Sequence, residues 1–153
     1  MEQEGLKVKG MYRVQITEDD KFVGDSGWLE NQVVNLGFRW YLAGSLGAIA
    51  NSSQVSYVAL GTGGAPAAGD TSLTGEVEVR TAVTAATSSD SKAVRFTATF
   101  SSAGSFVTDT QAISNIGLHR SATVGTLFSG AAYASSNVAT NQNVNVTYDI
   151  SFS

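Results

Sequence analysis

The ten residues that precede the C-terminal serine alternate between polar and apolar side chains. They read Asn143-Val144-Asn145-Val146-Thr147-Tyr148-Asp149-Ile150-Ser151-Phe152. Side chains of a β-strand point alternately to its two faces, so this period of two predicts a strand with one buried and one polar face. Because the strand runs to within one residue of the chain end, we expect it to be paired within a sheet.

The same period of two recurs along most of the chain. Further strands are predicted at 7–17, 55–60, 77–85, 94–100, 112–119 and 126–134. Many short strands separated by turns are typical of a β-sandwich or a barrel-like domain.

The clearest hairpin is predicted between 77–85 and 94–100. A two-residue turn at Ser89-Asp90 places Val83 opposite Phe96, so apolar side chains meet across the ladder. We therefore expect one long antiparallel pair whose apolar face belongs to the core.

Residues 33–50 contain the helix that we expect in this chain. Asn35 is placed to cap its first turn, and Gly47 is placed to end it. Apolar residues recur at helical spacing at Phe38, Tyr41, Leu42, Leu46 and Ile49. We expect about three turns, with this apolar face packed on the sheet.

These patterns predict a mainly β protein with two parts. A β-sandwich or jelly-roll-like domain with one packed α-helix covers 31–153, and an N-terminal arm or hairpin covers 1–30. Within the arm, residues 7–17 alternate except for a slip near Gly10, which predicts a β-bulge. The acidic segment 18–21 predicts a turn into a short return strand.

Composition excludes several classes of function. The 153 residues include no cysteine and one histidine, which rules out disulfides, thiolate zinc sites and multi-histidine metal centres. The formal net charge is −4 and the nine basic residues are scattered, so we expect no nucleic-acid binding. No apolar run has the length of a membrane-spanning helix. The acidic start at residues 1–4 differs from a secretory signal, so we expect synthesis in a cytoplasm.

Charge is unevenly distributed along the chain. Residues 40–69 and 121–148 contain no Asp, Glu, Lys or Arg. The cores of protein interfaces are depleted in charge, which favours the interpretation that much of this surface contacts other proteins. A surface solvated by Ser, Thr and Asn is the alternative.

Two constellations resemble catalytic or cofactor motifs but lack the context that the chemistry requires. Gly61-Thr62-Gly63-Gly64 is followed by neither a helix start nor Gly-Lys-Ser/Thr, so it favours a turn over a phosphate-binding loop. His119 and Asp109 have no Gly-x-Ser-x-Gly nucleophile context. This favours a histidine at a strand end or an interface.

Paired carboxylates have a structural interpretation as well. Glu76 and Glu78 alternate on one strand face, and Arg80 follows on the same face. A salt network is favoured over glycosidase chemistry or a calcium site, which needs several oxygen ligands in one loop. We assign no catalytic residue, no cofactor-binding residue and no metal ligand, and we expect no enzymatic activity.

Aromatic residues give one further alternative. An exposed cluster beside Asp or Asn would suit carbohydrate binding, and its candidates are Trp28, Tyr41, and Tyr133 near Asn137. Placement on apolar faces favours core or interface anchors instead.

Four segments and the closing strand form an ordered pattern over about residues 31–153. The segments are Val33-Val34-Asn35-Leu36-Gly37-Phe38, then Tyr57-Val58-Ala59-Leu60-Gly61-Thr62-Gly63 continuing through Ala67, Gly69-Asp70-Thr71-Ser72-Leu73, Glu76 and Arg80, then Ile113-Ser114-Asn115-Ile116-Gly117-Leu118, and Gly125-Thr126-Leu127-Phe128. In order and spacing this pattern resembles a recurrent type of small virion protein of tailed bacteriophages.

The resemblance implies a β-rich structural component of the virion, with no cofactor and no catalytic residues. The pattern does not separate head proteins from tail proteins, and within this class we expect a capsid decoration (cement) protein that stabilises the head through contacts with the major capsid protein or other virion proteins. The alternative is a tail-fibre, head-fibre or baseplate appendage or adaptor subunit, with host carbohydrate as a ligand. We expect a homo-oligomer such as a trimer, with neither nucleic acid nor membrane as a partner. Strand addition by residues 7–16 to a neighbouring sheet would be a natural grip.

Overall fold

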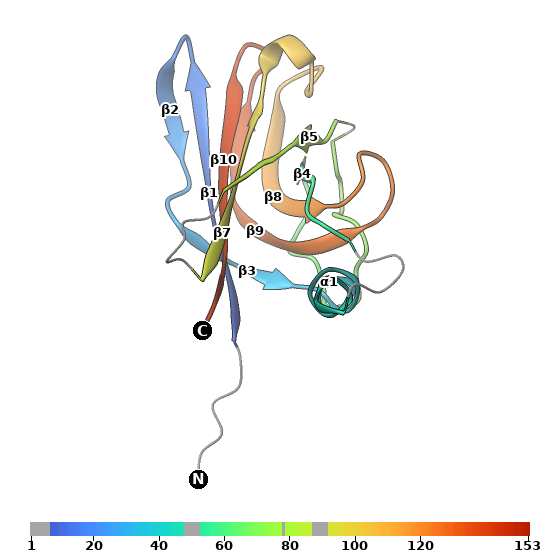
Figure 1. Cartoon of the computed structure of the whole chain (residues 1–153). Coiled ribbons are helices and arrows are strands. Elements are labelled where there is room, and N and C mark those ends of the chain that lie inside the picture. Colours follow the sequence, from blue (N-terminus) through green and yellow to red (C-terminus); the bar gives the residue numbers. More distant parts are fainter. Residues whose placement is uncertain (1–6, 48–52, 78, 87–91) are drawn as a thin grey trace.

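The computed structural model describes residues 7–47, 53–77, 79–86 and 92–153 (Figure 1). Its strands are β1 (Val8–Glu18), β2 (Lys21–Asp25), β3 (Leu29–Val33), β4 (Tyr57–Gly61), β5 (Thr81–Ala82), β6 (Thr84–Ala86), β7 (Ala93–Phe100), β8 (Gln111–His119), β9 (Leu127–Val138) and β10 (Asn143–Phe152). A π-helical segment at Gly37–Ala43 continues into α1 (Gly44–Leu46), and a 3-10 turn covers Ser102–Gly104.

The strands form one nearly closed sheet. Its order is β5-β4-β8-β9-β3-β1-β10-β7-β6, with β2 paired to β1. β3 joins the two halves because it pairs with both β1 and β9. At the other end, β5 and β6 are consecutive in the chain and flank Val83, so the two halves also meet there. The predicted mainly β, sandwich-like fold with one helix is confirmed.

The closing strand β10 lies inside the sheet, between β1 and β7. It pairs with β1 from Phe152 opposite Val8 to Asn143 opposite Thr17, and with β7 on its other side. On its predicted apolar face Val144, Val146, Tyr148 and Ile150 are buried, and Phe152 is partly buried against the core. Reciprocal backbone hydrogen bonds join Lys7, the first described residue, to Ser153.

The first strand is therefore a central strand and not an arm. The hairpin alternative is confirmed, since β1 and β2 pair antiparallel across a turn at Asp19-Asp20. The boundary expected between 1–30 and 31–153 falls inside β3, which pairs with both halves of the sheet. Strand addition by residues 7–16 to a neighbour is wrong, because β1 is already paired on both sides.

The bulge expected near Gly10 is also wrong. The register with β10 runs through Gly10 without a shift, and the irregularity lies between Ile16 and Thr17. Alternation is regular because Gly10 and Tyr12 are buried, whereas Met11 is partly exposed on the other face. The apparent slip in the sequence arises because Met11 is an apolar residue on the outer face of the strand.

The long hairpin is only partly present. Ala85 lies opposite Phe96, so the register differs by two residues from the prediction that placed Val83 there. Upstream of Val83 the chain leaves β7 and pairs with β4, because the strand crosses between the halves of the sheet at that residue. The turn expected at Ser89-Asp90 lies outside the described residues.

The helix buries a different face from the one predicted. Of the predicted apolar set, Tyr41 is buried, Leu42 is partly buried, Phe38 is exposed and Leu46 is 92% exposed. Ile49 lies outside the described residues. The buried positions Gly37, Tyr41 and Gly44 keep the i, i+4, i+7 spacing of a helix, but two of them are glycines, which a pattern of large apolar residues does not mark.

Glycine allows this helix to approach strand β9 closely. The buried helical residues are Gly37, Tyr41 and Gly44, and a Cβ on Gly37 would overlap the carbonyl oxygen of Phe128. Asn35 makes no side-chain cap, and its backbone N–H donates to the carbonyl of Ala68 at 2.7 Å. Gly47 is the C-cap residue as predicted.

The glycine-rich connection 62–76 packs against the outer surface of strands β8 and β9. Gly117 and Gly130 lie opposite each other on these strands, and Leu73 lies directly over both. Leu73 belongs to a second, small hydrophobic cluster, which consists of Val34, Ala59, Leu73 and Leu127. The prediction of a structural turn in place of a phosphate loop agrees with this packing.

Candidate interaction surfaces

His119 and the acidic residues form neither a His–Asp pair nor an acidic cluster among the described residues. His119 ends β8 and is fully buried, and neither ring nitrogen has a hydrogen-bond partner among the described residues, so it forms no pair with Asp109. Burial, reinforced by the positive charge of Arg80, lowers the pKa of His119 to about 3. No group of three or more His, Asp or Glu side chains in the described ranges could hold a metal ion.

The salt network expected around Arg80 is present in part. Arg80 forms a bidentate ion pair with Glu76, and its guanidinium also donates to the carbonyls of Ser121 and Val124 at 2.7 Å each. The Arg80 side chain is only 5% exposed. These bonds attach the segment that precedes β5 to the β8–β9 connection. Glu78 lies outside the described residues.

The most exposed apolar side chains of the β1–β2 hairpin lie on strand β2. Phe22 is 68% exposed and Val23 is also exposed. Within the described part of the chain, β2 pairs only with β1, so its outer edge carries unpaired backbone groups. We call this edge, with Phe22 and Val23, the β2 edge.

The β2 edge is held rigidly at both ends. Asp19 and Asp20 have positive φ values of 49° and 62°, as a two-residue hairpin turn requires. At the other end, Asp25 accepts hydrogen bonds from Arg13 at 3.0 and 2.5 Å and from the backbone N–H of Gly27 at 2.9 Å. These bonds hold the pKa of Asp25 well below its usual range, chiefly through the Arg13 guanidinium.

The aromatic residues considered for carbohydrate binding do not form one exposed cluster. Tyr41 is buried, and Tyr133 packs against Tyr12 with ring centroids 6.0 Å apart. Trp28 is 41% exposed and lies beneath the guanidinium of Arg95, 5.6 Å from the ring centroid. Asp149 neutralises this arginine through two hydrogen bonds of 2.8 Å each.

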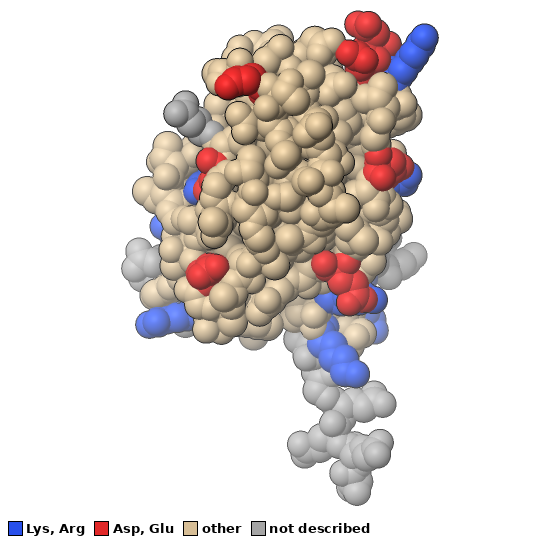
Figure 2. Space-filling view, turned by 180° about the vertical axis from the view of Figure 1, so that it is seen from behind, with Lys and Arg blue, Asp and Glu red and all other residues tan. Residues whose placement is uncertain are grey.

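A broad uncharged face lies behind the view of Figure 1. Figure 2 shows acidic and basic side chains only near the margins of this face. Strand β9 has no charged residue, and its exposed positions are Ala132, Ala134, Ser135 and Asn137. Beyond Gly130, β9 pairs with β8 alone among the described strands. The uncharged stretch 121–148 is thus partly buried and partly a surface of small neutral side chains.

The sequence predicts the return strand of this hairpin, but it does not indicate that the outer edge of that strand is unpaired among the described strands.

Comparisons with known proteins give no identification. No family model, no curated protein and no solved structure matches the chain. No helix among the described residues has the length and apolar character needed to cross a membrane.

Proposed function

We propose that this chain is a structural subunit of a tailed-bacteriophage particle, most simply a capsid decoration protein. The observation that carries the proposal is the β2 edge: β2 pairs only with β1 among the described strands, and Phe22 and Val23 on it are exposed. Isolated proteins usually protect such edges from pairing, whereas interaction domains use them to add a strand from a partner. We propose a phage particle as the assembly because residues 31–153 resemble small virion proteins of tailed bacteriophages.

The physical basis of decoration is multivalency. A symmetric oligomer that contacts several capsid subunits gains avidity without a strong individual contact. A protein that binds the assembled lattice and not the loose subunits also stabilises the shell by mass action. The neutral face of β9 and the β2 edge offer two separate surfaces, one for a second copy of the chain and one for the capsid.

The direct test is cryo-electron microscopy of virions from the phage that encodes this chain. Density for the chain on the icosahedral shell supports decoration. Density on the tail or baseplate supports the appendage alternative, and absence of the chain from virions contradicts both.

The β2 edge can be tested by substitution. We expect Phe22→Ser combined with Val23→Ser to weaken binding to undecorated heads by at least about tenfold, because it removes the exposed apolar contacts of the edge. Leu46→Ser is the matched control, since Leu46 is 92% exposed on the helix and not on this edge. Co-sedimentation with heads measures the binding. Loss of binding in the control but not in the double variant would refute this role of β2.

A further inference from the structure

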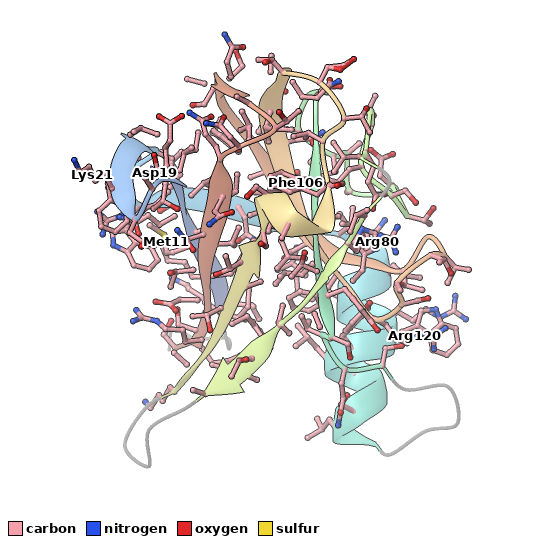
Figure 3. The ribbon with its side chains drawn as sticks, turned by 90° about the horizontal axis from the view of Figure 1, so that it is seen from above. Met11, Asp19, Lys21, Arg80, Phe106 and Arg120 are labelled. Atoms are coloured by element: carbon pink, nitrogen blue, oxygen red, sulfur yellow. The ribbon has the colours of Figure 1, made fainter. Side chains whose placement is uncertain are left out.

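A hollow of about 290 Å³ lies between the helix and the β8–β9 connection. The helix lines it with Trp40 and Tyr41, and the connection lines it with Arg120, Gly125 and Thr126. Figure 3 shows Arg80 and Arg120 on the side of the molecule that carries the helix, away from Asp19 and Lys21 at the tip of the β1–β2 hairpin. The hollow is therefore separate from the β2 edge.

The floor of this hollow is fixed by hydrogen bonds. Tyr41 is buried, and its hydroxyl donates to the carbonyl of Thr126. The Thr126 hydroxyl in turn accepts from the backbone N–H groups of Arg120 and Ser121 at 3.2 and 3.3 Å. The helix and the connection are thus joined beneath the hollow, and a ligand would meet a preformed surface.

Arg120, which lines the hollow, and Arg39, which lies over Trp40, have no carboxylate partner among the described residues. Arg120 donates to the Ser53 hydroxyl at 3.3 Å, and the Arg39 guanidinium lies 4.7 Å from the centroid of the Trp40 ring. Of the four ion pairs among the described residues, none involves Arg39 or Arg120. By contrast, Arg80 is neutralised by Glu76.

We propose that this hollow binds an acidic sugar, with the carboxylate on Arg120 and the sugar ring against Trp40. A guanidinium matches a carboxylate through two parallel hydrogen bonds, and Arg120 exposes such donors beside an aromatic side chain. Ser53 and Thr126 also line the hollow, and their hydroxyl groups are hydrogen-bonded to the Arg120 guanidinium and to backbone N–H groups respectively. Its volume is near the lower limit of about 300 Å³ for ligand pockets, which suits one sugar ring better than an extended peptide.

The test compares a sugar with its acidic counterpart. We expect D-glucuronate to bind the full chain with a Kd of about 1 mM, and D-glucose to bind at least about tenfold more weakly, by titration followed with NMR. The indole N–H resonance of Trp40 should shift on binding, and that of Trp28 should not.

Substitutions locate the charge that selects the ligand. Arg120→Gln should weaken glucuronate binding by at least about tenfold, and Arg120→Lys should weaken it less because the charge remains. Arg95→Gln is the matched control, since Arg95 lies over the other tryptophan, Trp28, but is already paired with Asp149. It should leave glucuronate binding unchanged.

Three results would overturn the proposal. They are equal affinity for glucose and glucuronate, unchanged affinity in Arg120→Gln, and tighter binding of a glutamate tripeptide than of glucuronate. If Arg120→Gln fails to fold, the selectivity of the wild-type chain and the Trp40 resonance still decide. The titration requires no virion, so its failure leaves the structural role of the chain untouched.

Discussion

The two halves of the sheet differ in how their outer faces meet solvent. The outer face of β1, β10 and β7 is open, with Thr97, Thr147 and Asn145 among its polar side chains and the Arg95–Asp149 pair across it. The outer face of β8 and β9 is covered around Gly117 and Gly130 by the connection 62–76. On the open face, the alternation of polar and apolar residues accounts for which side chains are buried. The covered face instead carries a second hydrophobic cluster, and its packing depends on Gly117 and Gly130.

The two faces use arginine differently, and this difference gives the largest expected effect. Arg80→Gln should lower the free energy of unfolding by about 3–5 kcal/mol, because it leaves the mostly buried Glu76 carboxylate without its partner. Arg95→Gln on the open face should cost less than about 1 kcal/mol, since its side chain is 54% exposed. Urea denaturation measures both, and equal costs would show that the covered face is not dry.

The small cluster beneath the connection can be tested by removing its central side chain. We expect Leu73→Ala to lower the free energy of unfolding by about 2–4 kcal/mol, because Leu73 is buried over Gly117 and Gly130. Met11→Ala on the open face is the control, and it should cost less than about 1 kcal/mol because Met11 is partly exposed. A cost for Leu73→Ala as small as that of the control would mean that the connection contributes no core.

Sequence reasoning predicted the open face well and the covered face poorly. Strand β10 and its buried residues followed from the period of two, because one face was apolar and the other polar. The covered face carries Asn115, Gly117 and Gly130, and nothing in these residue types indicates burial. Their burial depends on a loop from a distant part of the sequence. The same limit applies to the helix, where Gly37 faces the sheet in place of a large apolar residue.

The sequence predicted contacts with other proteins but not which residues would form the contacting surfaces. Charge-free stretches indicated contacts between proteins, but they did not separate buried strands such as β4 from the exposed small side chains of β9. The hollow beside Arg120 combines a helix with a connection about eighty residues away in sequence, a juxtaposition that neither segment encodes alone.

Two neighbouring glycines of the connection sharpen the comparison further. A Cβ on Gly63 would overlap the backbone carbonyl of Thr74, whereas a Cβ on Gly64 has nothing within 4 Å. We expect Gly63→Ala to cost about 1–3 kcal/mol of stability through overpacking. Gly64→Ala should be neutral or stabilising by up to about 1 kcal/mol, because it restricts the unfolded chain. Thermal unfolding of both variants decides, and equal midpoints would contradict close packing of the loop.

The covered face can also be probed by pH, through His119 and without any substitution. His119 lies two residues beyond Gly117 along β8, hence on the covered side, and burial lowers its pKa to about 3. The unfolded chain has a histidine pKa of about 6.5, so below that pH the unfolded state binds a proton that the folded state does not. Stability should therefore fall as the pH falls from 6.5 toward 3, by up to about 1.4 kcal/mol per pH unit.

The histidine contribution can be separated from that of the carboxylates. The part of the slope between pH 6.5 and 5 that disappears when His119 is replaced belongs to His119, because an unperturbed histidine has a pKa of about 6.5. His119→Leu should abolish this slope while retaining the fold at pH 7. Asp25→Asn on the open side is the control and should leave the slope in this window unchanged, because Asp25 titrates below it. The same slope in wild type and His119→Leu would mean that water reaches the imidazole, and that the covered face is covered only in part.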